Sequence, residues 1–262
     1  KVGPQNRRAM ISDASFVGHH PRFKALVHRR LRKGWGLGMA TLIMGAWALL
    51  MFLACSSSWS WQNPWLYPAM ALQTFLFTGL FITAHDAMHG TVSLNPVLNR
   101  WIGRLCLWAF AFNSWNRMLP DHHRHHRHVG TDEDPDFGPP RFGAWFFGFV
   151  SHYVRWYQIL FCAILFNYLQ WLGVQGSSMV QFYIIPSFLS LLQLFYFGTY
   201  LPHFSDPGRG LVPNNVHRSR TQQARHLWAF LTCYFFGYHW EHHEAPATPW
   251  WMLPLTKSST FS

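Results

Sequence analysis

Residues 34–85 read GWGLGMATLIMGAWALLMFLACSSSWSWQNPWLYPAMALQTFLFTGLFITAH and contain no Asp, Glu, Lys or Arg. A second stretch of 50 residues, 156–205, is equally free of these four residue types. One bilayer crossing takes about 20 mostly apolar residues, so each stretch is long enough for two crossings joined by a short turn. The sequence therefore predicts an all-α integral membrane protein with four transmembrane helices in two hairpins.

The positions of the spans follow from the polar turns inside these two stretches. The turns are CSSSWSWQNP at 55–64 and QGSS at 175–178. The predicted spans are 35–54, 65–84, 156–174 and 179–201. There is no internal repeat and no low-complexity linker, so we expect 1–262 to form a single membrane domain.

The basic residues predict the orientation of the chain. Of the 21 Lys and Arg residues, nine lie in 1–34, seven in 85–155 and five in 202–262, and none lies in a hairpin turn. Cytoplasmic segments of membrane proteins carry this excess. We therefore expect both termini and the middle segment to be cytoplasmic, with no cleavable signal peptide before the first span. The net charge of +11 then reflects topology and contact with lipid headgroups, so nucleic acid is not an expected partner.

The cytoplasmic segments are predicted to form a helical cap. Two charge-free stretches, 105–116 and 226–240, are too short to cross a bilayer and are rich in Trp and Phe. We expect them to lie along the membrane interface or to cap the bundle. Asn95-Pro96 predicts a helix start, with Asn as the N-cap and Pro in the first turn. Pro120 predicts a second start, in a helix that ends by Gly130.

Ten of the 17 histidines lie in three short groups. These read HDAMH at 85–89, DHHRHHRH at 121–128 and HWEHHE at 239–244. Imidazoles three or four residues apart share one face of a helix. Neutral imidazole is a ligand of transition metals, and the eight histidines of the HxxxH and HxxHH motifs exceed what one ion accepts. Two metal ions are therefore predicted.

The histidine groups are predicted to meet at the cytoplasmic rim of the membrane. A helix from Trp65 to His89 would be roughly 37 Å long at 1.5 Å per residue, of which about 30 Å crosses hydrocarbon. His85 and His89 would then lie just above the cytoplasmic face. The fourth span ends at the same level, which adds His203 as a candidate. The remaining histidines are expected at the surface or as spare members of a dense run: His19, His20, His28, His123, His128, His152, His217 and His226.

Other metal chemistries do not match the sequence. A zincin protease needs HExxH, but Ala247 occupies the last position after His243-Glu244. A carboxylate di-iron bundle needs ExxH from two helices, and this spacing does not occur. The four cysteines are far apart and form no CxxC pair, which indicates neither a zinc site nor a disulfide framework. The site is therefore predicted to use histidine alone.

At these residues the sequence resembles the membrane fatty acid desaturase and hydroxylase superfamily, which carries HxxxH and two HxxHH motifs after pairs of spans. Within it, the sequence is similar to the bacterial and cyanobacterial β-carotene ketolases. The shared strings are HDAMHG at 85–90, DPDF at 134–137, YLPH at 200–203 and YHWEHHEAPATPWWMLP at 238–254. The similarity runs from about residue 20 to the end, and the last string is the most specific.

The resemblance implies an enzyme with two Fe ions that uses O2 as co-substrate and electrons from a ferredoxin-like donor. The implied iron ligands are His85, His89, His122, His125, His126, His239, His242 and His243. His203 fits an additional histidine that the wider superfamily uses after its fourth span, whereas Thr199 stands where stearoyl-CoA desaturases have an Asn. The implied location is a bacterial plasma membrane or a thylakoid, with the site on the cytoplasmic side.

The implied substrates are β-carotene and related carotenoids. Two successive hydroxylations of the ring 4-methylene would give a gem-diol that loses water to form a ketone, as in echinenone and canthaxanthin. Carboxylates near the histidines are expected to orient the imidazoles by accepting their N–H groups. The candidates are Asp86, Asp121, Asp134, Asp136, Glu241 and Glu244. Aromatic residues that line a polyene channel or pack the spans are sought among Phe75, Phe77, Phe81, Phe195, Tyr196 and Phe197.

Other functions remain open for the same residues. A carotenoid 3-hydroxylase or a lipid desaturase could be built on the same site. A non-enzymatic membrane metal carrier would need labile metal and polar residues within the spans, and we expect the spans to lack such residues. Because only deprotonated imidazole binds metal, metal affinity is expected to fall below about pH 6.5.

Overall fold

The computed structural model describes residues 16–206, 213 and 215–257, whose regular structure is helical. The remaining parts of the predicted segments 1–34 and 202–262 lie outside the described residues. In chain order the elements are η1 (Val17–His19), α2 (Pro21–Arg32), α3 (Trp35–Cys55), α4 (Leu66–Met88), α5 (Pro96–Ala109), α6 (Trp115–His128), α7 (Phe142–Tyr153), α8 (Trp156–Trp171), α9 (Gly176–Met179), η2 (Val180–Ile184), α10 (Ile185–Leu194), η3 (Phe195–Tyr200), α11 (Leu201–His203), α12 (His226–Cys233), α13 (His239–Glu244) and η5 (Trp250–Lys257).

Three helices of the described chain are long and apolar enough to cross a membrane. They are α3, α4 and the continuous helix Gly176–His203, which includes the π-helical segments η2 and η3. These helices correspond to the predicted first, second and fourth spans. The fourth begins at Gly176, earlier than predicted, because α8 already ends at Trp171 and Gly173 turns the chain with a φ of 93°.

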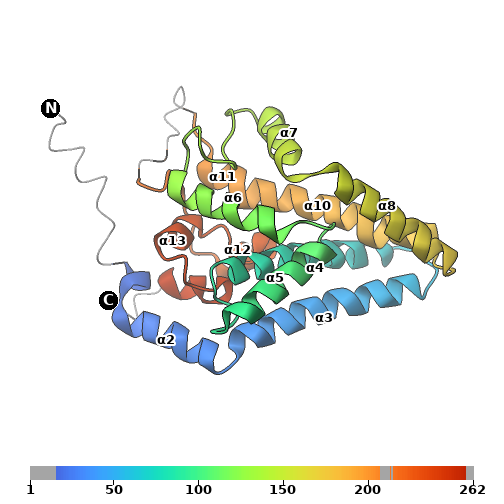
Figure 1. Ribbon diagram of the computed structural model, residues 1–262, viewed down its shortest axis with the longest axis horizontal. Helices are drawn as coiled ribbons and strands as arrows, with labels where there is room; N and C mark the ends of the chain where they lie inside the picture. The colour runs from blue at the N-terminus through green and yellow to red at the C-terminus, as the bar shows by residue number, and fades with distance from the viewer. Residues whose placement is uncertain (1–15, 207–212, 214, 258–262) are drawn as a thin grey trace.

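The predicted third span, 156–174, is a shorter helix than expected. The 16 residues of α8 cover roughly 24 Å, which is less than a hydrocarbon core of about 30 Å. Val154 and Arg155 have extended backbones, so α7 and α8 meet at an angle of 75° (Figure 1). A fourth crossing exists only if this bent pair counts as one span.

The long helices lie side by side, and α4 packs against α3, α5 and α10 (Figure 1). The contact between α4 and α10 contains polar side chains: Thr78 Oγ1 lies 2.8 Å from Ser190 Oγ and donates to Gln193 Oε1 at 2.7 Å. Gln193 Nε2 in turn donates to the carbonyl of Thr232 at 2.6 Å, which ties α12 to the pair. Interhelical hydrogen bonds of this kind hold membrane helices together. The expectation that the spans lack polar residues is therefore wrong, although the polar groups are uncharged and bind one another.

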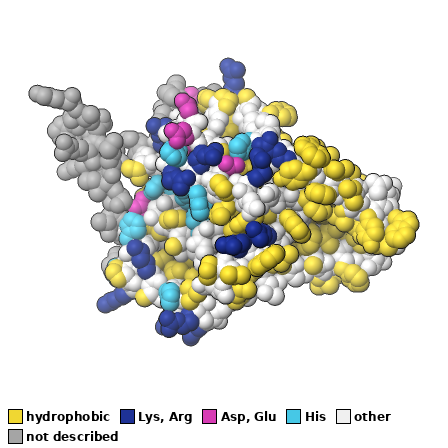
Figure 2. Space-filling model, in the orientation of Figure 1, with side chains coloured by type: hydrophobic (Ala, Val, Ile, Leu, Met, Phe, Trp, Pro, Cys, Tyr) yellow, Lys and Arg dark blue, Asp and Glu magenta, His cyan; other side chains and the backbone are white. Residues whose placement is uncertain are grey.

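The surface divides into a polar end and an apolar end (Figure 2). The visible Lys, Arg, Asp, Glu and His side chains gather at one end, and apolar side chains cover the other. Large apolar side chains are exposed along α3 and α8, among them Phe52 at 67% and Ile159 at 65%. Such a surface suits a lipid environment and not water, as expected for a membrane protein.

The helical cap differs from the sequence prediction at one helix start. Helix α5 begins as predicted, with Asn95 Oδ1 accepting from Val97 N at 2.8 Å. Helix α6, however, begins at Trp115, so Pro120 lies inside it and the predicted start at Pro120 is wrong. The buried Trp115 ring lies against Gly103 of α5, where any side chain would collide with it. This packing fixes the first turn of α6 ahead of the proline.

Candidate metal centre

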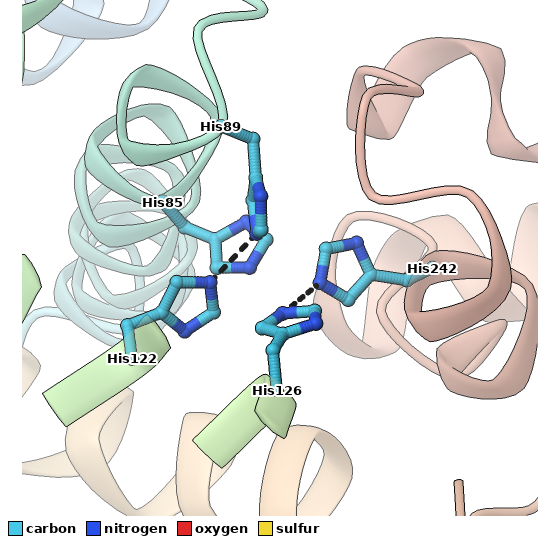
Figure 3. Close-up of side chains that lie close together, drawn as sticks. All are labelled: His85, His89, His122, His126 and His242. Atoms are coloured by element: carbon cyan, nitrogen blue, oxygen red, sulfur yellow. Dashed lines mark hydrogen bonds between the residues drawn. The ribbon is translucent and has the colours of Figure 1, made fainter. Parts of the chain in front are cut away.

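The structure brings all nine sequence-predicted histidines together in two groups. The first group, shown in Figure 3, consists of His85, His89, His122, His126 and His242. The second group consists of His125, His203, His239 and His243. Within each group, one ring nitrogen of every residue lies within 4.8 Å of those of the others. The prediction of two metal ions therefore has a geometric counterpart, and each group could hold one ion.

Two helices each serve both groups. Adjacent residues of a helix point about 100° apart, so a pair of neighbouring histidines diverges. On α6, His126 joins the first group and His125 the second. On α13, His242 joins the first group and His243 the second. The two groups are therefore neighbours that share their supporting helices, while the ends of α4 and α11 each supply only one group.

The Nε2 atoms converge within each group. In the first, His89 and His122 lie 2.6 Å apart through these atoms, which Figure 3 marks with a dashed line. In the second, the corresponding distance from His203 to His239 is 2.8 Å. Within the described chain, both ring nitrogens of His85 are buried without a hydrogen-bond partner. A buried nitrogen without a partner is costly, and a metal ion would use the lone pair of the nitrogen that carries no proton, so the donor set fits a metal.

Burial sets the protonation state of the imidazoles. Desolvation, with repulsion from neighbouring imidazoles, lowers the pKa values of His89, His122, His126, His239, His242 and His243, that of His126 to about 2. These rings are therefore neutral at pH 7, which is the form that binds metal. His125 differs: burial lowers its pKa, but the hydrogen bond to Asp134 and the charge of Asp136 outweigh this effect and raise it.

Asp134 is the predicted carboxylate that orients an imidazole directly. His125 Nδ1 donates to Asp134 Oδ1 at 2.9 Å, which leaves Nε2 facing the second group. The carboxylate also accepts from the backbone of Gly130 at 2.8 Å and of Asp136 at 2.9 Å. Burial alone would raise the pKa of Asp134, but these donors lower it, so the carboxylate is charged. Asp136 lies 3.8 Å from His125 Nδ1 and accepts from the Tyr153 hydroxyl.

Two other candidate ligands, His85 and His203, have different neighbours at Nδ1. Asp86 lies 3.8 Å from His85 Nδ1 and accepts from the backbone N–H of Trp250 at 3.1 Å. His203 Nδ1 lies 3.0 Å from the carbonyl of Arg218, to which it donates. The Arg218 carbonyl takes the place of a carboxylate, and no pattern in the sequence marks a backbone group for this role.

Three predicted orienting carboxylates have other partners. Asp121 accepts from His152 at 3.0 Å, and Glu241 pairs with Lys257 at 2.6 Å. Each precedes a histidine of the first group on its helix, and the carboxylate of each pairs with a residue outside both groups. Glu244 comes directly after His243 of the second group, and its carboxylate also pairs with residues outside both groups.

Glu244 pairs with two histidines that the sequence places at the surface. Its carboxylate lies 3.2 Å from His19 Nε2 and 2.7 Å from His217 Nε2. The His217 ring also lies 5.6 Å from the His243 ring, centre to centre. Glu244 thus joins η1 and the loop at His217 to the end of α13.

An apolar cavity of about 370 Å³ adjoins both histidine groups. His85, His122, His126 and His242 of the first group line it, as do His125 and His239 of the second. Of the aromatic candidates, Phe81 lines this cavity, whereas Phe75 stacks on Tyr234 at 4.3 Å. At its far end the wall includes Ile159, Ile184 and Phe188, which are 65%, 46% and 54% exposed. The cavity therefore reaches the apolar flank of the molecule between α8 and α10.

Apolar spans that end at two adjoining imidazole groups, beside an apolar cavity, define a class: histidine-rich membrane proteins able to hold two metal ions. The profile of the fatty acid desaturase family matches residues 59–161 and 151–259. The chain belongs to this family. The resemblance inferred from the histidine motifs is thereby confirmed.

Curated relatives narrow the comparison. The β-carotene 4-ketolase 3 of Haematococcus lacustris is 42% identical over 69% of this chain and 58% of its own length. The zeaxanthin 4-ketolase of Chlamydomonas reinhardtii is 38% identical over 84% of this chain and 52% of its own. The β-carotene ketolase of Paracoccus sp. (strain PC1) is 39% identical over 85% of this chain and 92% of its own. The chain thus spans little more than half the length of the first two relatives. No solved structure matches significantly.

Proposed function

We propose that this protein is an O2-dependent di-iron β-carotene 4-ketolase. The observation that carries the proposal is the position of both histidine groups in the wall of one apolar cavity. The three relatives described above are named as ketolases, and two of the names give β-carotene as the substrate. A carotenoid is an apolar molecule that dissolves in the bilayer, and an apolar cavity open to the lipid-facing flank suits it.

The nine histidines of the two groups would hold the iron ions, five at the first and four at the second. When bound, the iron pair supplies the activation of O2. The chain itself supplies placement: Asp134 and the Arg218 carbonyl fix the rings of His125 and His203. Apolar cavity residues such as Phe81 and Met88 keep water away from the reacting carbon.

The proposed reaction is two hydroxylations of one carbon. Each consumes one O2, two electrons and two protons, replaces a C–H with a C–OH, and releases one water. The second converts the alcohol into a gem-diol, which loses water to give the ketone. Allylic C–H bonds are weak, so the carbon held nearest the oxidant reacts. The cavity wall therefore decides the position of oxidation, since a displacement of about 1 Å can cost on the order of 100-fold in rate.

The proposed partners are the lipid bilayer, carotenoids and a ferredoxin-like electron donor. The outer face of α6 carries the exposed Arg117, Arg124 and Arg127 directly behind the histidines of the same helix. A small acidic protein would find complementary charge there. By the positive-inside tendency, this end and both termini would be cytoplasmic in a bacterial plasma membrane or a thylakoid.

The product of the reaction tests the proposal. Membranes that contain the protein are incubated with β-carotene, O2 and a reducing system, and the carotenoids and lipids are analysed by chromatography and mass spectrometry. A ketone at ring position 4 supports the proposal. A 3-hydroxyl product or a new acyl double bond would instead indicate a carotenoid 3-hydroxylase or a lipid desaturase.

A metal carrier is separated from an enzyme by a pair of variants. His125→Ala removes a member of the second group, whereas His128→Ala removes a histidine of the same helix that lies outside both groups. An oxygenase should lose all turnover with His125→Ala and keep it with His128→Ala. Partial metal flux without carotenoid oxidation in either protein would support the carrier.

A further inference from the structure

One wall of the apolar cavity is a turn with an uncommon backbone conformation. Phe110, Ala111 and Asn113, which line the cavity, connect α5 to α6. Ala111 and Phe112 have φ values of 51° and 55°, in the left-handed region that residues other than glycine seldom adopt. Two consecutive residues of this kind persist only where surrounding structure holds them, and such positions cluster at ligand sites.

Gln158 on α8 holds this turn. Its side chain is 4% exposed, and both ends of its amide are used. Nε2 donates to the carbonyl of Ala111 at 3.1 Å, and Oε1 accepts from the backbone N–H of Arg155 at 2.6 Å. Gln158 thus connects the strained turn to the start of α8, and it lines the cavity itself.

Two weaker contacts support the same turn. The Tyr183 hydroxyl donates to the carbonyl of Ala109 at 3.3 Å, and the Phe112 ring lies 5.6 Å from that of Phe161 on α8. Tyr183 also lines the cavity. Residues of α8 and η2 therefore hold the turn in place, and two of them, Gln158 and Tyr183, line the cavity that would bind the substrate.

The histidines of α6 do not depend on these contacts. Trp115, in the first turn of α6, packs against Gly103 of α5. This contact places α6, and with it His122, without the help of Gln158. A loosened turn would therefore change the shape of the cavity and leave the metal groups in place.

We infer that Gln158 is a specificity-determining residue: by holding the strained turn at Ala111 and Phe112, it sets the position of the substrate ring in the cavity. The inference rests on the proposed carotenoid oxidation. Gln158 acts on the substrate through the turn and exchanges no proton or electron with it. Its loss should therefore spread oxidation over more than one ring carbon.

The test uses Gln158→Leu in the full-length protein, loaded with iron and reconstituted in lipid nanodiscs. We expect kcat/KM for β-carotene to fall on the order of 10-fold, with products oxidised away from position 4 and with unchanged iron per chain. Asn167→Leu is the matched control, because Asn167 is exposed on the same helix and, among the described residues, its side chain donates only to Ala163 of that helix. A purely structural role would lower the amount of folded protein without changing the product ratio.

A rescue experiment tests the role of the strained backbone. Ala111→Gly added to Gln158→Leu should restore most of the lost regioselectivity, since glycine adopts a positive φ without steric cost. If Gln158→Leu does not fold, Tyr183→Phe loosens the same turn with one hydroxyl removed and should shift the products in the same direction.

Three results would overturn the inference: wild-type regioselectivity in Gln158→Leu, loss of iron in that variant, or no rescue by Ala111→Gly. Failure of the proposed function is separate, because the wild-type protein would then give no 4-keto product from β-carotene.

Discussion

Replacement of Asp134 by Asn should weaken one metal site and spare the other. The Asp134 carboxylate is 1% exposed and lies 2.9 Å from His125 Nδ1, and of the two histidine groups described above His125 belongs to the second. Asn keeps the size of the side chain but removes the charge that holds the Nδ1–H. Loss of such an orienting partner typically costs about 10- to 100-fold in metal affinity, which corresponds to about 1.4 to 2.7 kcal/mol.

The assay is metal analysis during chelator titration. The iron-loaded protein is exposed to rising chelator concentrations, and the iron retained per chain is measured at each step. Asp134→Asn should release one ion at about 10- to 100-fold lower chelator than wild type and keep the second. Asp132→Asn, an exposed acid of the same loop, is the control and should behave as wild type. Release of both ions together, or of neither, would refute the assignment of Asp134 to one group.

Three further predictions address packing, the division of ligands and pH. Gly103→Ala should destabilise the protein by about 1 to 3 kcal/mol in denaturant unfolding, because the new methyl group collides with Trp115. Gly45→Ala, whose methyl group would meet open space, should not destabilise the protein. Equal effects of the two variants would contradict the packing of Trp115 against Gly103. His203→Ala and His89→Ala should each reduce bound iron to about one ion per chain while retaining different ions; loss of both ions from either variant would argue against two separable groups. The metal-free protein should lose stability below about pH 6.5, by up to about 1.36 kcal/mol per pH unit for each imidazole whose pKa burial lowers, because the unfolded chain takes up protons that the lowered pKa values keep off the folded one. Unfolding free energies measured at pH 7.5, 6.5 and 5.5 check this, and a rise on acidification would contradict it.

The histidines could be predicted because their signal is local. HxxxH and HxxHH place the first and last imidazole of each motif on one helical face whatever the rest of the chain does, and the length of α4 puts His85 and His89 at the end of a span. The division into two groups could not be predicted. It depends on the rotation of α6 and α13 about their axes, which tertiary packing sets. Tertiary packing also decides that Asp134 reaches His125 of the second group, whereas Asp121 pairs with His152, which lies outside both groups.

The shape of the cavity was equally beyond sequence patterns. The break between α7 and α8 falls at Val154 and Arg155, without a glycine or proline to mark it. The strained turn at Ala111 and Phe112 also lacks the glycine that usually accompanies a positive φ. At Ala111 and Phe112, long-range contacts such as the hydrogen bond from Gln158 hold a backbone that the local residues do not favour.

The opening between α8 and α10 determines which substrate concentration, that in water or that in the bilayer, sets the occupancy of the cavity. In the proposed membrane orientation, a molecule that enters past Ile159 and Phe188 arrives from within the lipid and never crosses water. Occupancy is then governed by the number of substrate molecules per lipid, a two-dimensional density. For the proposed carotenoid oxidation, adding inert lipid at a fixed total amount of carotenoid would lower the rate, and concentrating the carotenoid in a smaller area of bilayer would raise it.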